Sequence, residues 1–211
     1  IGFKGSSVSG MPGILLLAMA DTHTRKLQLR RELRLHRNNL SNSVQRTAAQ
    51  ALVNSVTQVP IWPTSQRIAL YLAADGEIDT GAIQNLARDR QKQLFLPVIS
   101  DDHLLRFAYW DTGATLVPNR YNILEPPAEA RDCPVSALDI VFLPVVGWDR
   151  RGGRLGMGGG YYDRTLANIS GPLLVGLAHD GQQVDDIPRE SWDVALDYVA
   201  TDTDLYSSTV K

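Results

Sequence analysis

Residues 139–163 read DIVFLPVVGWDRRGGRLGMGGGYYD. The apolar run at 140–146 is typical of a strand that is buried on both faces of a parallel sheet. The glycine-rich segment after it leads into a helix predicted for residues 161–169. Ligands bind at the carboxyl edge of parallel sheets in this succession of strand, loop and helix. The sequence therefore predicts a ligand site at this point.

The rest of the chain continues the alternation of strands and helices. Thr80 is predicted to cap the third helix, and either Ser41 or Asn42 the second, with Gln45 completing a capping box on Asn42. The proline-rich stretch 125–134 is expected to be a long surface loop within one domain. This order predicts an α/β fold with a largely parallel, covered sheet. Helices are predicted at 24–40, 42–56, 80–91 and 161–169, and strands at 67–72, 93–99, 104–110, 139–146, 173–178 and 198–201.

Composition sets the broad class of protein. The chain has 211 residues, of which 44% are hydrophobic and 21% charged, as in an ordinary globular protein with a substantial core. A net charge of −2 excludes a globally basic nucleic-acid binder. The single cysteine, Cys133, cannot form an internal disulfide, which favours a reducing, cytoplasmic location.

The N-terminal residues contain a short apolar run. The apolar run at 14–20 is too short to span a bilayer and only faintly resembles a secretory signal. Residues 1–24 are expected to be an extension that is disordered or foreign to the native protein, with Met19 as a candidate native start. Residues 25–211 are expected to form a single domain.

The glycine-rich segment has the composition of a phosphate-binding loop. Six of the nine residues from 152 to 160 are glycine, and Arg151 and Arg154 lie among them. Glycine tolerates positive φ and leaves backbone N–H groups free to face a ligand at a helix N-terminus. Guanidinium groups add bidentate contacts to phosphate oxygens. A polyphosphate ligand is predicted, and the alternative is a glycine-rich surface turn.

Two carboxylates and a histidine follow at predicted strand ends or loop mouths. Asp163 comes just after the glycines, and Asp180 follows the strand at 173–178. Two carboxylates beside a polyphosphate are the usual way to hold Mg²⁺. Asp163 could instead be a first-turn charge that favours the helix dipole. His179 is either a ligand contact or a hydrogen-bonded structural residue.

The first predicted helix carries a cationic stripe. Lys26, Arg30, Arg34 and Arg37 recur at spacings of four, four and three, beside an apolar stripe of leucines. The stripe can be a solvated face, a nucleic-acid-binding face, or a surface that presents Lys26 and Arg30 to a bound nucleotide. The acidic loop at 75–79 is either a polar-substrate contact or a turn with a helix N-cap.

Several blocks of sequence together resemble the 5-formyltetrahydrofolate cyclo-ligase family, also called 5,10-methenyltetrahydrofolate synthetases. The resemblance covers about residues 25–201 and is most specific in the glycine segment. The blocks are YLAADGEIDT at 71–80, LPV at 96–98, LVPNR at 116–120, EP at 125–126, RLGMGGGYYDR at 154–164, GLAHD at 176–180, and QQV at 182–184 followed by Pro188, Glu190, Trp192 and Asp193.

The resemblance implies an ATP- and Mg²⁺-dependent ligase of one-carbon metabolism. ATP phosphorylates the formyl oxygen of 5-formyltetrahydrofolate, folate N10 attacks the activated carbon, and ring closure gives 5,10-methenyltetrahydrofolate with ADP and phosphate. The protein then mainly has to align the reactants and neutralise charge. The implied fold is a three-layer sandwich related to sugar-phosphate isomerases and coenzyme A transferases.

The resemblance also implies roles for individual residues. Nucleotide contacts are expected from Lys26, Arg30 and residues 154–162, which are Arg154, Leu155, Gly156, Met157, Gly158, Gly159, Gly160, Tyr161 and Tyr162. Arg154, Tyr161 and Asp163 are expected to take part in catalysis, and Leu72, Glu77 and Tyr161 to contact the folate. Asp163 and Asp180 are expected to hold the metal. The expected partner is the folate, with or without a polyglutamate tail, bound to a monomer and without nucleic acid or membrane.

The sequence departs from the family pattern at a few positions. Asn122 stands where glycine is usual, and asparagine tolerates the left-handed conformation that a turn requires there. Asn38, Asn39 and Gly181 are further departures outside the assigned site. The alternative functions are a non-catalytic nucleotide- or folate-binding regulator on the same scaffold and an RNA-binding accessory protein. Clustered acidic residues after 184 argue against the second.

Overall fold

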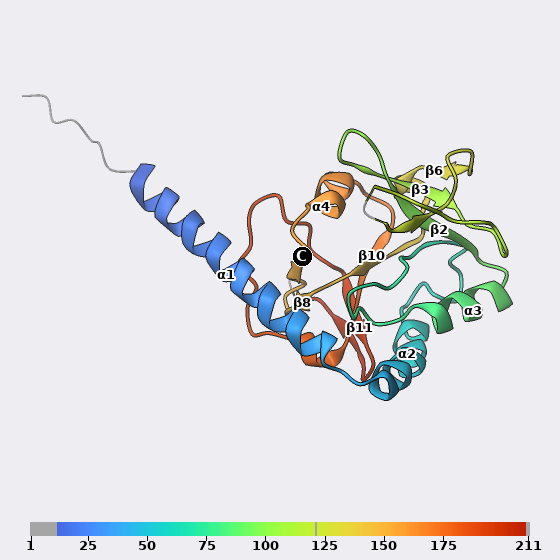
Figure 1. The fold of residues 1–211 in the computed structure, drawn as a ribbon, viewed down its shortest axis with the longest axis horizontal. Helices are drawn as coiled ribbons and strands as arrows, with labels where there is room; N and C mark the ends of the chain where they lie inside the picture. The colour runs from blue at the N-terminus through green and yellow to red at the C-terminus, as the bar shows by residue number, and fades with distance from the viewer. Residues whose placement is uncertain (1–11, 121, 210–211) are drawn as a thin grey trace, which may run out of the picture.

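The computed structural model describes residues 12–120 and 122–209 and contains one main sheet (Figure 1). Its spatial order is β12-β11-β10-β7-β1-β2-β3-β6, and the five strands from β11 to β2 are mutually parallel. The predicted, mostly parallel sheet is therefore confirmed. Its strands are β1 (Arg67–Ala69), β2 (Gln93–Ile99), β3 (Leu105–Tyr109), β6 (Asp132–Cys133), β7 (Ile140–Pro144), β10 (Leu173–Ala178), β11 (Tyr198–Thr201) and β12 (Leu205–Ser207).

Alternating side chains of the central strands build a core on each face of the sheet. In β7, Ile140 and Phe142 pack with α2 (Asn42–Thr57) and α3 (Gly81–Asp89), whereas Val141 and Leu143 pack with α4 (Tyr161–Leu166) on the other face. Because successive side chains of a strand point to opposite faces, an unbroken apolar run is what a doubly covered strand requires. Helices and loops on both faces complete the predicted three layers.

The chain leaves β1 and β7 in opposite directions, although these strands are neighbours. From β1 it continues through α3 to β2, and from β7 through α4 to β10. In open α/β sheets such a switch point opens a crevice at the carboxyl ends of the strands, where ligands bind. The segments after β1, β7 and β10 therefore line the expected ligand site.

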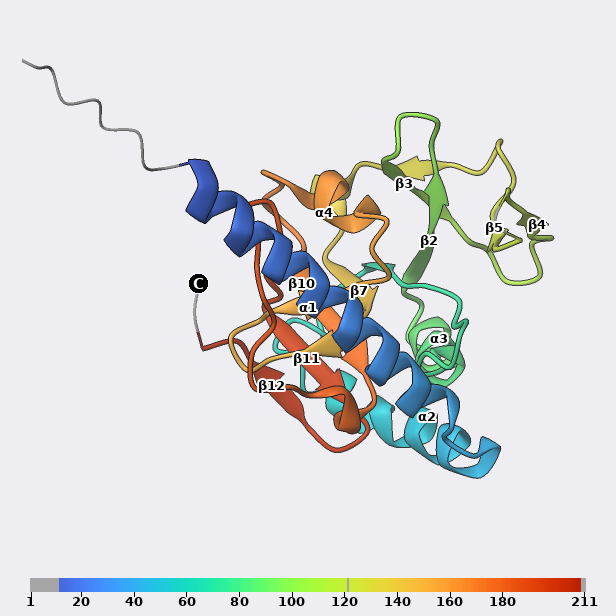
Figure 2. The ribbon, with the colours of Figure 1, turned by 60° about the vertical axis from the view of Figure 1, so that its left-hand side comes forward.

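Helix α1 (Pro12–Asn38) runs across these loops, and its N-terminal turns extend away from the sheet (Figures 1 and 2). The predicted start at residue 24 was wrong, because the leucine- and alanine-rich run before it continues the helix. Proline suits the first helical position, where its missing N–H has no helical partner. Residues 1–11 lie outside the described chain. None of the described helices is long and apolar enough to cross a bilayer.

Several element boundaries differ from the predictions. Strand β1 and helices α3 and α4 end earlier than expected, and the proline-rich stretch 125–134 joins the main sheet through β6. Thr80 stands at the N-cap of α3, but its hydroxyl donates to Tyr71 O (2.7 Å), while Asp79 Oδ1 accepts from Gly81 N (2.6 Å). Asn122 has φ 59, as its turn requires.

Two short antiparallel pairs were not predicted. One consists of β4 (Val117–Pro118) and β5 (Leu124–Glu125), and it projects beyond β2 (Figure 2). The other consists of β8 (Gly147–Trp148) and β9 (Arg154–Leu155) within the glycine-rich segment. Pairs of two residues leave almost no periodic pattern in a sequence, so they follow only from the packing around them.

The cap of α2 gives a test of local stability. Ser41 is the N-cap and accepts from Val44 N (3.3 Å), whereas Gln45 donates to Arg37 O (3.2 Å) and completes no box on Asn42. We expect Ser41→Ala to lower the free energy of unfolding by about 1 kcal/mol, measured by urea unfolding. Ser41→Asp keeps an acceptor and should stay near wild type. Equal losses in both variants would contradict the cap.

Candidate active site

The glycine-rich segment divides into a structural turn and an open loop. Asp149 is 1% exposed, and its Oδ1 accepts from Arg151 N and Gly153 N, both at 2.8 Å. Its Oδ2 accepts from Ile187 N at 3.0 Å. Burial acts to raise the pKa of Asp149, but these hydrogen bonds outweigh it and hold the pKa below its usual value. Gly152 and Gly153 therefore serve the β8–β9 turn.

The open loop follows at residues 156–160. Gly158 and Gly160 have φ 101 and 67, in the left-handed region that favours glycine. Within the described chain, no acceptor is recorded for the backbone N–H groups of residues 157–160. Helix α4 begins directly after Gly160. N–H groups without an internal acceptor in successive positions can form a cradle for an anion, so this second half is the part of the segment that could bind phosphate.

Arg154 and Asp163 form an ion pair at the floor of the open loop. The Arg154 side chain is only 5% exposed, and its Nη2 pairs with Asp163 Oδ1. Its Nε is buried without a hydrogen-bond acceptor in the described structure. An unpaired buried guanidinium N–H is costly, and a ligand oxygen would satisfy it. By contrast, Arg151 pairs with Asp186 at the surface and is not part of this floor.

Two cations of α1 lie near this site: Arg30 contacts the open loop directly, and Lys26 contacts the loop that carries Asp193. Arg30 Nε donates to Gly156 O (2.8 Å), and its guanidinium lies against Gly158. Lys26 is 9% exposed, and its Nζ lies 2.5 Å from Asp193 Oδ2. Burial lowers the pKa of Arg30, and the nearby Asp193 opposes that shift. Of the three interpretations of the stripe, these contacts favour the one in which α1 faces a nucleotide.

Asp193 was not predicted as a site residue. Val194 N donates to Asp163 Oδ1 (3.2 Å), so the loop that carries Asp193 lies against Asp163. Asp193 lies thirty positions further along the chain than Asp163, and no local periodicity relates the two. Only its place in the final resembling block could have drawn attention to it.

Asp180 lies in a different environment. Its Oδ1 accepts from the hydroxyls of Thr201 (3.1 Å), Thr203 (2.8 Å) and Tyr206 (2.9 Å). Burial acts to raise the pKa of Asp180, but the three hydroxyl donors outweigh it and hold the pKa low. Asp163 and Asp180 share no hydrogen-bond partner in the described residues. No cluster of three or more His, Cys, Asp or Glu side chains suited to a metal occurs in that part of the chain.

His179 stays open between its two interpretations. It is 3% exposed, its backbone N–H donates to Gln182 Oε1 (2.8 Å), and its side-chain Nε2 has no partner in the described structure. Burial lowers the pKa of His179, which favours the neutral ring.

The loop after β1 brings Glu77 to the crevice. Its side chain is 11% exposed, and its Oε2 accepts from Ala74 N (3.1 Å). Burial raises the pKa of Glu77, while Ala74 N and Arg37 act to lower it. The charge of Glu77 in turn adds to burial in raising the pKa of Tyr162, which Arg154 opposes. Tyr162 therefore lies near both Glu77 and Arg154, whereas Leu72 packs against the core beneath.

The two adjacent tyrosines face different surroundings. The Tyr161 ring lies 5.2 Å from the Arg164 guanidinium, and its hydroxyl lies 3.5 Å from Arg120 Nη2. Tyr161 thus faces the β4–β5 side of the loop, and Tyr162 faces Arg154 and Glu77. Of the two, only Tyr161 was predicted to be catalytic, and nothing in the pattern distinguishes their directions.

The sequence did not reveal the burial of Arg37, which lies on the same predicted cationic stripe as Lys26. It is fully buried, and its guanidinium donates to Asp75 and to Val145 O. From sequence alone, a cation in the last turn of a helix is expected to be exposed to solvent, because the loops that cover it in the fold are not known.

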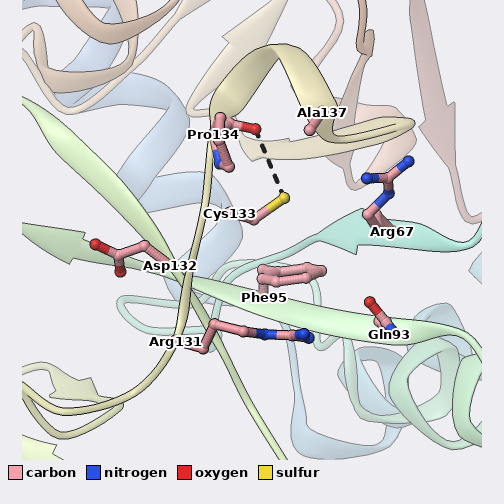
Figure 3. Close-up of a pocket in the computed structure, with 8 residues that line it drawn as sticks. All are labelled: Arg67, Gln93, Phe95, Arg131, Asp132, Cys133, Pro134 and Ala137. Atoms are coloured by element: carbon pink, nitrogen blue, oxygen red, sulfur yellow. Dashed lines mark hydrogen bonds between the residues drawn. The ribbon is translucent and has the colours of Figure 1, made fainter.

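A separate pocket of about 200 Å³ (Figure 3) lies at the amino ends of the parallel strands, which is the edge of the sheet opposite the crevice. Arg67 and Gln93, the first residues of β1 and β2, border it with Arg131 and Cys133. Cys133 Sγ lies 3.6 Å from Pro134 O, and burial raises the pKa of the Cys133 thiol. A protonated thiol is a poor nucleophile, so this pocket adds no covalent chemistry to the crevice.

Comparison with known proteins decides the family. The model of the 5-formyltetrahydrofolate cyclo-ligase family matches residues 22–202. The chain belongs to this family. A 5-formyltetrahydrofolate cyclo-ligase of Haemophilus influenzae is 37% identical over 177 residues, which cover 82% of this chain and 95% of that protein. One of Escherichia coli is 38% identical over 168 residues, which cover 77% and 91%.

Solved structures agree with this placement. The NMR structure of Aquifex aeolicus 5,10-methenyltetrahydrofolate synthetase has a TM-score of 0.76 and 29% identity, and the match covers 88% of this chain and 94% of that one. The predicted family, fold and cyclo-ligase class are thereby confirmed, with the conversion of 5-formyltetrahydrofolate to 5,10-methenyltetrahydrofolate. ATP use is a property of the family.

The division of the glycine segment can be tested by stability. A Cβ on Gly153 would overlap the Asp149 carboxylate, whereas a Cβ on Gly156 meets only Arg154 Nη1, at 3.0 Å. We expect Gly153→Ala to lower the free energy of unfolding by about 1–3 kcal/mol, and Gly156→Ala to change it much less. Urea unfolding measures both. Equal losses would contradict the assignment of the first two glycines to the turn.

Proposed function

We propose that the crevice binds ATP and 5-formyltetrahydrofolate side by side and transfers the γ-phosphoryl group to the formyl oxygen. Folate N10 then attacks the activated carbon, the ring closes, and phosphate leaves. The observation that supports this most is the buried Arg154 at the floor of the open glycine loop, with an unsatisfied Nε and a carboxylate partner. We assign to Arg154 the stabilisation of the charge that develops on the transferring phosphoryl group.

The nucleotide is assigned to the glycine loop and the cations around it. N–H groups of residues 157–160 would bind phosphate oxygens, and Lys26, Arg30 and Arg154 would neutralise their charge. Leu155 is buried beneath the loop and supports it, while Met157 is half exposed at its rim. Arg154, Tyr161 and Asp163 are the proposed catalytic residues, and they position and polarise the reacting groups without forming a covalent intermediate.

The folate is assigned to the segment after β1. Glu77 is the carboxylate of that loop whose side chain is most enclosed, and it is suited to accept hydrogen bonds from amine or amide groups of the pterin. Leu72 supports the loop from the core, and Tyr161 lies on the side of the glycine loop toward β4 and β5. The Glu77 carboxylate and the Arg154 guanidinium thus hold the two substrates from adjacent loops.

The carboxylates beside the phosphate loop fit a Mg²⁺ ion. Asp163 and Asp193 offer hard oxygen ligands on neighbouring segments, and both are paired with cations that are themselves assigned to phosphate. Mg²⁺ needs only one or two protein carboxylates when phosphate oxygens and water complete its ligands. Bound there, it would offset negative charge on the phosphates. We therefore replace Asp180 with Asp193 as the proposed partner of Asp163.

We further propose that residues 25–211 form the catalytic domain of a cytoplasmic monomer that accepts the folate with or without a polyglutamate tail. Lys26, Arg34 and Arg37 already pair with carboxylates of the same chain, which supports a protein without a nucleic-acid partner. We also propose that the protein has no membrane partner.

Loss of the Arg154–Asp163 pair should abolish most of the activity. The assay mixes protein, 5-formyltetrahydrofolate, Mg²⁺ and ATP and follows the methenyl product by its near-ultraviolet absorbance. We expect Arg154→Ala and Asp163→Ala each to lower kcat by about 100-fold or more, because stabilisation of developing charge is lost. Arg151→Ala removes an exposed arginine of the same segment and should keep wild-type activity.

The same assay decides between an enzyme and a regulator. ATP binding by the wild-type protein without methenyl product would favour the non-catalytic alternative. Full activity in Arg154→Ala or Asp163→Ala would overturn the site assignment while leaving the reaction intact.

Two variants test whether Asp193 or Asp180 is the proposed second carboxylate ligand of Mg²⁺. We expect Asp193→Asn to raise the Mg²⁺ concentration needed for half-maximal activity by about tenfold, because a charged ligand is lost. Asp180→Asn should leave that requirement near wild type. A raised requirement in Asp180→Asn alone would restore the original pairing of Asp163 with Asp180.

A further inference from the structure

Arg37 contacts the loop after β1 and two parts of the segment after β7, namely its start at Val145 and the glycine loop at Met157. It stands in the last turn of α1 with 0% of its side chain exposed. Its Nε donates to Asp75 O (2.8 Å) and its Nη1 to Val145 O (3.2 Å). Its Nη2 donates to Asp75 Oδ2 (2.7 Å) and lies 3.9 Å from Met157 Sδ. One planar guanidinium thus reaches the loops after β1 and β7 and the glycine loop at once.

The loop after β1 depends on this contact for its shape. Asp75 has φ 51, a left-handed conformation that is uncommon outside glycine, and Gly76 follows with φ 72. A Cβ at Gly76 would meet the side chains of Asn38 and Arg37, so this loop is packed directly against the end of α1. The strained turn is therefore held from α1 by hydrogen bonds to the main chain and side chain of Asp75.

Glu77 lies beside the same guanidinium. Its Oε1 is 3.9 Å from Arg37 Nη2, and Arg37 opposes the rise in the pKa of Glu77 that burial causes. The other ionisable groups around it are Asp75 on its own loop, Tyr71 in the segment after β1 and Tyr162 on α4. None of these three is a cation, so Arg37 is the group in this set that favours the charged carboxylate.

We propose that Arg37 is a positioning residue of the cyclo-ligase, which holds Glu77 in place and charged for the folate and fixes the folate loop relative to the nucleotide loop. This inference rests on the proposed role of Glu77 as a folate contact. Arg37 itself is enclosed by protein and acts through Asp75, Glu77 and Met157.

The chain provides a matched control in Arg34. Its guanidinium binds the same Asp75 carboxylate through two hydrogen bonds of 2.7 and 3.0 Å, but from the exposed side. No contact of Arg34 with Val145, Met157 or Glu77 is recorded in the described structure. Arg34→Met and Arg37→Met therefore each remove an arginine from Asp75, and only the second removes one from Glu77.

The experiment measures kcat, the KM for each substrate and the pH profile of kcat/KM in variants shown to fold by circular dichroism. We expect Arg37→Met to raise the KM for 5-formyltetrahydrofolate about tenfold or more, and Arg34→Met to stay within about twofold. Without Arg37 the pKa of Glu77 rises further, so the charged form appears only at higher pH. The acid limb of the profile should therefore move to higher pH in Arg37→Met and stay in place in Arg34→Met.

Arg37→Lys tests separately the positive charge of Arg37 and the planar geometry of its guanidinium. Lysine keeps a cation near Glu77 but cannot form the planar fork that serves three loops. We expect the acid limb to return toward its wild-type position while the folate KM stays raised. If Arg37→Met does not fold, this variant carries the test alone, and a wild-type folate KM in Arg37→Lys would overturn the proposal.

Glu77→Gln distinguishes failure of this inference from failure of the proposed function. If Glu77→Gln leaves the folate KM unchanged, Glu77 is not a folate contact and the proposed site is wrong. If Glu77→Gln raises that KM but Arg37→Met keeps the wild-type KM and pH profile, the positioning role alone is wrong. Equal effects in Arg34→Met and Arg37→Met would also overturn it, because the shared loss would then be the bond to Asp75.

Discussion

Charge pairing holds α1 across the crevice, and the shape of the site depends on it. Lys26 pairs with Asp193, and Arg34 and Arg37 pair with Asp75. Leu33 adds a small apolar contact. Removing one partner of a buried ion pair typically costs about 3–5 kcal/mol, because the remaining charge is left without compensation. The helix therefore lies where the loops supply carboxylates and carbonyl groups, and those loops are the ones that line the proposed ligand site.

This arrangement links docking of the helix to the electrostatics of the site. Two of the three cations assigned to phosphate are already compensated by carboxylates within the chain, Arg154 by Asp163 and Lys26 by Asp193. Isolated buried charges would be costly, so pairing them keeps the cations in place before a ligand arrives. A bound polyphosphate would share these cations and leave Asp163 and Asp193 with oxygen atoms available to a divalent ion. One set of four charges can thus serve both the stability of the loops and the proposed binding of a metal nucleotide.

The sequence predicted those features that local patterns determine. The apolar runs placed the parallel strands, and the glycine segment identified both the edge of the sheet and the family. The short strands β8, β9 and β12 and the burial of Arg37 depend on segments that meet only in the folded chain. Arg37 has the same helical spacing as its exposed neighbours, and the covering loop of Asp75 lies nearly forty residues away. The choice between Asp180 and Asp193 likewise depends on a loop that returns to Asp163, which no periodicity reveals.

The glycine segment shows why composition alone overstates a ligand loop. Its first two glycines close a turn around the Asp149 carboxylate, and the later ones open toward solvent beside Arg30. Both tasks need close approach of the backbone, so both select glycine. In the first half the backbone closes on an internal carboxylate, and in the second half it is open to the anion that we propose binds there. Because the turn anchors β9, it fixes Arg154 at the start of the open loop and lets its guanidinium reach Asp163. The hydrogen-bonded turn at Asp149 therefore orients the Arg154 guanidinium, which the proposed chemistry requires.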